Sequence, residues 1–288
     1  MSFFQELPLI RSCHMSISRR LTEADRARVL DYISKEPEVT TFILGDIEQF
    51  GLTDPVCVFA LVNDDGSWDS IVVKFYTNFV CYSQHDHFDV LSMVTLIKEE
   101  ASQLYYGSIN GPHDIIAALA PYFDNLSLIS SHLARLDKLK SDQVAPAPEG
   151  SVIRRLGEDD YDEYFALLAS TDEYHELYRD GHSIELAKKQ KRADAAHGCV
   201  SYGVFYKDKL VSVASTSANN SKSAMIVGVC THKDRRNFGL ATAVVAQLCQ
   251  DELAAGKQFL TLFYDNPTAG HIYERIGFES VAQYAMLR

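Results

Sequence analysis

The chain has 288 residues, 47% hydrophobic and 23% charged, which is typical of a globular protein of one large or two ordinary domains. Its 39 acidic and 27 basic residues give a net charge of −12, which argues against binding to nucleic acid and is compatible with an amine substrate or with solubility alone. We find neither a signal peptide nor the ~18–20 apolar residues of a membrane helix, so we expect no membrane partner. Six scattered cysteines without a CxxC pair predict reduced thiols in a cytoplasmic protein and no metal site.

Two stretches predict a tandem duplication. RRLTEAD begins at Arg19 and RRLGEDD begins at Arg154, and each leads into an acidic, helix-like segment. Between them, the composition of KSDQVAPAPEGS at 140–151 is typical of a linker. We therefore predict an extension at 1–14, one domain at 15–139 and a second domain at 152–288.

Hydrophobic periodicity predicts the same order of elements in both halves. The first half contains a strand ISRRL, helices DRARVLDYI and TTFILGDIEQ, three strands ending in FVCYS, a helix at 88–104, a strand YYGSI, a helix near 113–120 and a closing strand. The second half repeats this order, with strands at 151–156, 198–206, 210–218, 224–231, 258–264 and 278–288 and helices at 158–170, 184–196, 241–255 and 267–276. The fold class is α/β (α+β), with mixed, mostly antiparallel sheets flanked by helices.

The segment RRNFGLA at 235–241 predicts an anion site, because it joins an apolar strand to a helix. The first N–H groups of a helix have no partner within the helix, and they attract anions together with the helix dipole. Gly239 permits close approach of the backbone to a bulky group, and Arg235 and Arg236 add positive charge. The pattern indicates phosphate or pyrophosphate binding, although it is neither a P-loop nor a dinucleotide fingerprint.

Two segments of the second half resemble the GNAT superfamily of acyl-CoA-dependent N-acyltransferases. VCTHKDRRNFGLATAVV at 229–245 is similar to that family's [QR]-x-x-G-x-[GA] loop after a strand. NPTAGHIYERIGF at 266–278 is similar to its N-x-x-A-x-x-x-Y-x-x-x-G-F pattern. The resemblance implies two tandem GNAT-like domains. In the first half QHDH at 84–87 stands where the loop should be, which predicts a half that has lost acyl-CoA binding.

The resemblance also implies a site. Loop amides would hold the coenzyme A pyrophosphate, the strand edge would pair with the pantetheine arm, Asn266 would contact that arm, and Tyr273 would act as general acid toward the leaving thiolate. The implied binding residues are Val229, Cys230, Thr231, Arg236, Asn237, Phe238, Gly239, Leu240, Ala241, Thr242, Asn266 and Tyr273. From their types alone, Asn266 could equally be a helix cap and Tyr273 a core residue.

The general base is not evident, because the strand at 224–231 contains no acidic residue. Tyr174, His175 and Glu176 lie where the family often lines its acceptor site. We predict direct transfer of an acetyl group from acetyl-CoA to a primary amine of a small molecule or peptide, in a monomer or a homodimer. The alternatives are a longer-acyl or aminoacyl transferase and a non-catalytic acyl-CoA-binding module.

Overall fold

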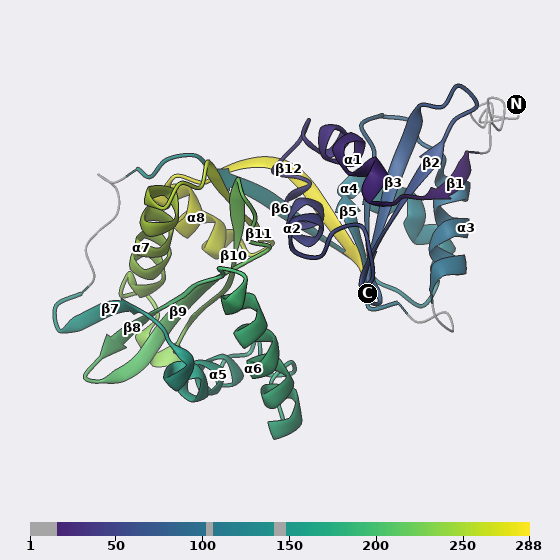
Figure 1. Cartoon of the computed structure of the whole chain (residues 1–288). Coiled ribbons are helices and arrows are strands. Elements are labelled where there is room, and N and C mark those ends of the chain that lie inside the picture. The colour runs from purple at the N-terminus through teal and green to yellow at the C-terminus, as the bar shows by residue number, and fades with distance from the viewer. Residues whose placement is uncertain (1–15, 102–105, 141–147) are drawn as a thin grey trace, which may run out of the picture.

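The computed structural model describes residues 16–101, 106–140 and 148–288, and its strands form one sheet. The twelve described strands follow the order β1-β2-β3-β4-β5-β12-β6-β11-β10-β9-β8-β7. The sheet has two wings, the first built mostly by the first half of the chain and the second mostly by the second half (Figure 1). The proposed extension at 1–14 and most of the proposed linker lie outside the described residues.

The first half of the chain contains its elements in the order predicted from periodicity. Its strands are β1 (Ile17–Arg20), β2 (Val56–Val62), β3 (Trp68–Phe75), β4 (Asn78–Tyr82), β5 (Ser108–Pro112) and β6 (Leu128–Leu136). Its helices are α1 (Arg26–Ile33), α2 (Thr41–Phe50), α3 (Val90–Glu100) and α4 (His113–Leu119). Apolar side chains of α1 and α2 pack on one face of the sheet and those of α3 and α4 on the other, so both faces are covered.

The second half of the chain repeats that order. Its strands are β7 (Ser151–Arg155), β8 (Ser201–Tyr206), β9 (Lys209–Ser217), β10 (Ser223–Thr231), β11 (Phe259–Tyr264) and β12 (Glu279–Leu287). Its helices are α5 (Tyr161–Ala169), α6 (Gly181–Ala196), α7 (Leu240–Ala254) and α8 (Pro267–Ile276). Helices α7 and α8 cover one face, and α5 packs on the other with α6 beside it (Figure 1).

The closing strands of the two halves are exchanged. Strand β6 belongs to the first half by sequence but pairs antiparallel with β11, while β12 pairs antiparallel with β5. The two exchanged strands also pair with each other, from Glu279 opposite Arg135 to Leu287 opposite Leu128. Tyr284 and Leu287 consequently complete the core of the first wing, and Leu136 completes that of the second.

Helix α2 of the first half also lies against the second half. The Phe42 and Phe263 rings stack with centroids 5.9 Å apart. Glu48 accepts a hydrogen bond of 2.6 Å from the Ser221 backbone N–H. A Cβ on Gly45 would lie 3.1 Å from the Ala218 carbonyl oxygen, so this close contact of helix and loop favours a glycine. The two wings are therefore fixed to each other by side chains as well as by the sheet.

None of the helices in the described residues has both the length and the apolar character needed to cross a membrane. The five cysteines within the described residues are free thiols, and four of them are buried.

Candidate functional site

Strands β10 and β11 separate in the middle of the second wing. Their parallel pairing runs from Ser223 opposite Phe259 to Ile226 opposite Leu262, and beyond that point only β9 remains paired with β10. A bulge between Val227 and Cys230 bends β10 at this position, where Gly228 has a φ of +62°. The edge of β10 that faces away from β9 is thus free of a strand partner over its last residues.

The free edge can be assigned to particular backbone groups. The His232 N–H donates to the Val211 carbonyl of the neighbouring strand at 2.9 Å. Because backbone groups alternate sides along an antiparallel ladder, those of Thr231 point to the other edge. Arg236 Nε donates to the Thr231 carbonyl at 3.3 Å, in agreement with that direction. This edge can pair with an extended, amide-bearing arm, as an added strand would.

The turn between β10 and α7 exposes a row of backbone donors. Among the described residues, the N–H groups of 237–242 have no hydrogen-bond acceptor, and the first α7 bond is Ala243 N–H to the Gly239 carbonyl at 3.0 Å. Asn237 and Gly239 have φ of +68° and +77°. No side chain caps α7, and a Cβ on Gly239 would meet no atom within 4 Å. Free amides, the helix dipole and open space above Gly239 together suit a phosphate-bearing ligand.

The two arginines of this turn are engaged elsewhere. The Arg235 guanidinium lies 4.4 Å from the centroid of the Tyr206 ring. Arg236 Nη2 pairs with the Glu173 carboxylate at 3.1 Å, and both side chains are partly exposed. The donors of the anion site are therefore backbone amides, and Arg236 links the turn to the segment between α5 and α6. Sequence reasoning did not identify Glu173, because 63 residues separate it from Arg236.

Tyr273 lies on α8 with 8% of its surface exposed, and its ring centroid is 5.9 Å from that of Tyr264. Burial, with a smaller contribution from Cys249, raises the Tyr273 pKa to about 12. The phenol therefore stays protonated near neutral pH, and its hydroxyl makes no hydrogen bond to any of the described residues. It is a core residue whose neutral hydroxyl can donate a hydrogen bond.

The other implied residues lie on these same elements. Cys230 is buried with its Sγ 3.6 Å from Thr171 Oγ1, and Thr231 Oγ1 is 2.8 Å from Ser212 Oγ. Thr242 is buried in the first turn of α7. Asn266 is the N-cap of α8 and accepts a 2.9 Å hydrogen bond from the Thr268 N–H. The interpretation of Asn266 as a helix cap is thus confirmed. Its amide nitrogen is left to contact a ligand.

Of the three acceptor-site candidates, one points toward this site. Burial raises the pKa of Tyr174. The residue also lies close enough to Tyr273 and Cys230 for their charges to add to this rise. His175 is exposed, with Nδ1 3.0 Å from the Ala169 carbonyl oxygen. Glu176 is exposed and lies 3.6 Å from Arg179.

A polar cluster lies under α5 and α6 on the same face of the sheet as Cys230. Lys191 Nζ is 3.2 Å from Ser215 Oγ, and Ser215 Oγ is 3.0 Å from the Tyr164 hydroxyl. Ser201 Oγ lies 2.8 Å from Ser215 Oγ. Periodicity alone indicates that Tyr164 is a core residue and that Lys191 belongs to a charged helix, so it gives no signal for their contact.

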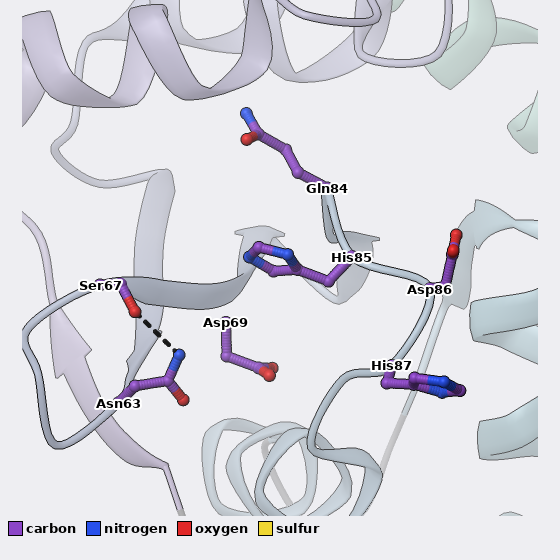
Figure 2. A pocket seen from close by; sticks show the side chains of 7 residues that line it. All are labelled: Asn63, Ser67, Asp69, Gln84, His85, Asp86 and His87. Atoms are coloured by element: carbon purple, nitrogen blue, oxygen red, sulfur yellow. Dashed lines mark hydrogen bonds between the residues drawn. The ribbon is translucent and has the colours of Figure 1, made fainter.

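The first half differs at the equivalent helix. Asp89 caps α3, accepting from the Ser92 N–H at 3.0 Å, and the Asp89 N–H itself donates to the Asp69 carboxylate at 3.0 Å. The QHDH residues line a pocket of about 520 Å³ with Asn63, Ser67 and Asp69. Figure 2 shows Asp69 lying between the Asn63–Ser67 turn and His85. The Asp69 and Asp89 carboxylates thus accept hydrogen bonds from N–H groups at the start of α3, where an anion would otherwise bind. Within the described residues no group of three or more His, Cys, Asp or Glu side chains could hold a metal ion.

Residues 148–287 match the family model described as GNAT acetyltransferase. A comparison with curated proteins finds no match. A solved GCN5-related N-acetyltransferase from Sphaerobacter thermophilus is 13% identical, with 94% of each chain covered and a TM-score of 0.63. A tandem GNAT protein from the clavulanic acid biosynthesis pathway is 12% identical, with 94% of this chain and 97% of that chain covered and a TM-score of 0.59.

A GCN5-related N-acetyltransferase-like protein from Streptococcus suis is 18% identical, with 93% of this chain and all of that chain covered and a TM-score of 0.56. At these identities the likeness concerns the fold, and it extends over both wings. Together with the family match over the second half, the separated strands and the open α7 turn, these findings place the chain in the GNAT superfamily, with a tandem arrangement of two GNAT-like halves.

Proposed function

We propose that the protein is an N-acyltransferase that transfers an acetyl group from acetyl-CoA directly to a primary amine, with its active site in the second wing. The observation that carries this proposal is the row of unpartnered amides at 237–242, placed next to the free edge of β10. Phosphates are held by such amides, and an amide-bearing arm pairs with such an edge, so one ligand with both parts fits the two features. Coenzyme A brings a pyrophosphate and a pantetheine arm together.

The residues take these roles in the proposed complex. The amides from Asn237 to Thr242 hold the pyrophosphate, and the backbone of Val229–Thr231 pairs with the arm. A backbone N–H at the bulge donates to the thioester carbonyl oxygen and stabilises the charge that develops there as the amine attacks. Asn266 donates from its amide nitrogen to the arm. Tyr273 donates a hydrogen bond, and then its proton, to the leaving thiolate.

The first half does not bind a second donor in this proposal. Binding there would place a pyrophosphate against Asp69 and Asp89, whose carboxylates already accept the hydrogen bonds at the start of α3. The cost of bringing like charges together in a partly buried site opposes it. Helix α2 instead contributes by covering the sheet of the second wing, through the Phe42–Phe263 contact.

Calorimetric titration of the whole protein with acetyl-CoA tests the donor assignment. We expect one site per chain, followed by release of free coenzyme A thiol when a suitable amine from a library of primary amines is added. Two equivalent sites would contradict the assignment of the first half. Binding without thiol release from any amine would favour a non-catalytic acyl-CoA-binding module, and tighter binding of longer acyl-CoA compounds would favour a longer-acyl transferase.

A further inference from the structure

A chain of hydrogen-bonded groups connects Lys191 with the bulge of β10. Lys191 Nζ, Ser215 Oγ and the Tyr164 hydroxyl follow one another at 3.2 and 3.0 Å. Tyr164 and Ser215 are both nearly fully buried, at 4% and 2% exposure. Lys191 Nζ also lies 3.9 Å from the centroid of the Tyr164 ring, so three different elements, α6, β9 and α5, hold the chain in place.

The inner end of the chain touches the point where β10 leaves β11. A Cβ on Gly228 would lie 2.9 Å from the Tyr164 hydroxyl oxygen, closer than real Cβ contacts allow. Gly228 also has a φ of +62°, so backbone and packing both require glycine there. In the proposed complex this bulge carries the thioester carbonyl, and the attacking amine must approach the same carbon atom. Tyr164 therefore lies beside the reacting nitrogen.

The outer end of the chain opens into a small cavity. This cavity of about 50 Å³ is lined by Lys191, Asp194, Ser201 and Thr216, with Arg155 and Cys199 among its other walls. A single water needs ~10–15 Å³ of such space and several polar partners, and both are available here. A proton that reaches Lys191 can thus pass to water on the side away from the substrate.

The surroundings of Lys191 allow it to gain and lose a proton near neutral pH. Burial lowers the pKa of Lys191 to about 8, while the charges of Asp194 and Cys199 act in the opposite direction. The Tyr161 and Tyr164 rings face the ammonium from α5, and Arg155 lies in the wall of the adjacent cavity. A lysine on a solvated surface would have a pKa of about 10.4 and stay charged.

We propose that Tyr164, Ser215 and Lys191 form a proton relay that deprotonates the acceptor amine. The substrate ammonium gives a proton to the Tyr164 oxygen, Tyr164 passes its own proton to Ser215 Oγ, and Ser215 passes its proton to the neutral Lys191 amine. The net change is transfer of one proton from the substrate to Lys191, and no other bond is altered. Lys191 then releases the proton to water in the cavity. The relay rests on the proposed function and supplies the base that the β10 strand lacks.

The test compares Lys191→Met with Lys188→Met, which removes a charge from the same helix at a surface ion pair with Asp162 and Glu185. The assay is kcat against pH from 6 to 10, with the primary alkylamine that gives the fastest thiol release. Without the relay, only the free amine reacts. Because a free alkylamine has a pKa of about 10.4, we expect Lys191→Met to be about a hundredfold slower at pH 8 and to approach the wild type by pH 10. Lys188→Met should follow the wild type.

A second pair of variants distinguishes the groups of the relay from the other polar side chains around them. Ser215→Ala breaks the chain and should show the same loss at pH 8, whereas Ser201→Ala removes a neighbour that is not in line and should keep the wild-type profile. Acetyl-CoA affinity should be unchanged in all four variants. A pH profile of Lys191→Met that runs parallel to that of the wild type would overturn the relay and leave the proposed function standing. If the wild-type protein itself did not bind acetyl-CoA, both would be overturned.

An NMR titration of the lysine side chains needs no acceptor and decides the matter independently. The Lys191 ammonium should titrate with a midpoint near 8 in the wild-type protein, assigned by its absence from Lys191→Met. Lys188 should titrate well above it. A Lys191 midpoint of about 10 or higher would overturn the relay even if no amine is turned over.

Discussion

Replacing Gly239 with valine is expected to abolish the anion site without unfolding the protein. The residue is the N-cap of α7 with a φ of +77°, and a Cβ built on it meets no protein atom within 4 Å. The cost to folding is therefore confined to backbone strain. The new side chain extends into the open space above the unpartnered amides of 237–242, where we place the pyrophosphate.

The magnitudes of the two effects differ. A side chain in left-handed backbone costs about 1–2 kcal/mol of the free energy of unfolding. Hydrogen bonds to a charged group are worth about 1.5–3 kcal/mol each, so the loss of two phosphate contacts weakens binding by about 3 kcal/mol or more. Because about 1.4 kcal/mol corresponds to a tenfold change, the Kd for acetyl-CoA should rise about a hundredfold or more.

The same helix provides a matched control. Gly256 follows the C-terminal end of α7 with a φ of +106°, and its added Cβ also meets nothing within 4 Å. Gly256→Val should therefore lower the free energy of unfolding by a similar amount in urea denaturation, while calorimetry finds the wild-type Kd. If Gly239→Val bound acetyl-CoA as tightly as Gly256→Val does, the assignment of the turn to the pyrophosphate would be refuted.

Three further substitutions test other parts of the structure. Tyr273→Phe should lower kcat by about 10²-fold or more and leave the Kd for acetyl-CoA unchanged, and equal turnover would remove its role as an acid. Asp89→Ala should cost about 1 kcal/mol in urea unfolding through loss of the α3 cap, and calorimetry should still find one acetyl-CoA site; a second site would show that the cap alone excludes the donor. Burial raises the pKa of Asp46 to about 7. Between these two pKa values the Asp46 carboxyl is protonated in the folded state and ionised in the unfolded state, where its pKa is 3.8. The free energy of unfolding therefore falls as the pH rises toward 7. Asp46→Asn should remove about 2 kcal/mol of this loss between pH 5.5 and 8, and identical pH dependence in urea unfolding of variant and wild type would contradict the shift.

The order of elements was predictable because it depends on local signals. Gly256 and Gly277 follow the last turns of α7 and α8, and Pro267 begins α8; glycine after a helix and proline at its start are local signals of a helix boundary. The turn between β8 and β9 has positive φ at Lys207 and Asp208, which suits a two-residue hairpin. The exchange of β6 and β12 was not predictable, since both strands have the same alternation and either could close either wing.

The open turn of the candidate site was likewise predictable from sequence, because it is built from contiguous residues around Gly239. The side-chain contacts around this turn and under α5 and α6 were not. The Arg236–Glu173 pair and the contact of Lys191 with Ser215 join residues 63 and 24 positions apart, and nothing in either segment indicates the other. Charged residues on α6 look alike in sequence, yet Lys188 is paired at the surface while Lys191 is turned inward.

The exchanged strands have a consequence for synthesis on the ribosome. Strand β12 is translated last, yet it lies between β5 and β6 and contributes Tyr284 and Leu287 to the first wing. At ~5–20 residues per second, roughly eight to thirty seconds pass between the emergence of β6 and that of β12. During this interval β5 presents an open edge to which β6 itself can pair, and such an arrangement must be undone before the chain closes. We therefore expect a chain that ends after residue 140 to aggregate more readily than the whole chain, because residues 279–287 are missing from the edge of β5.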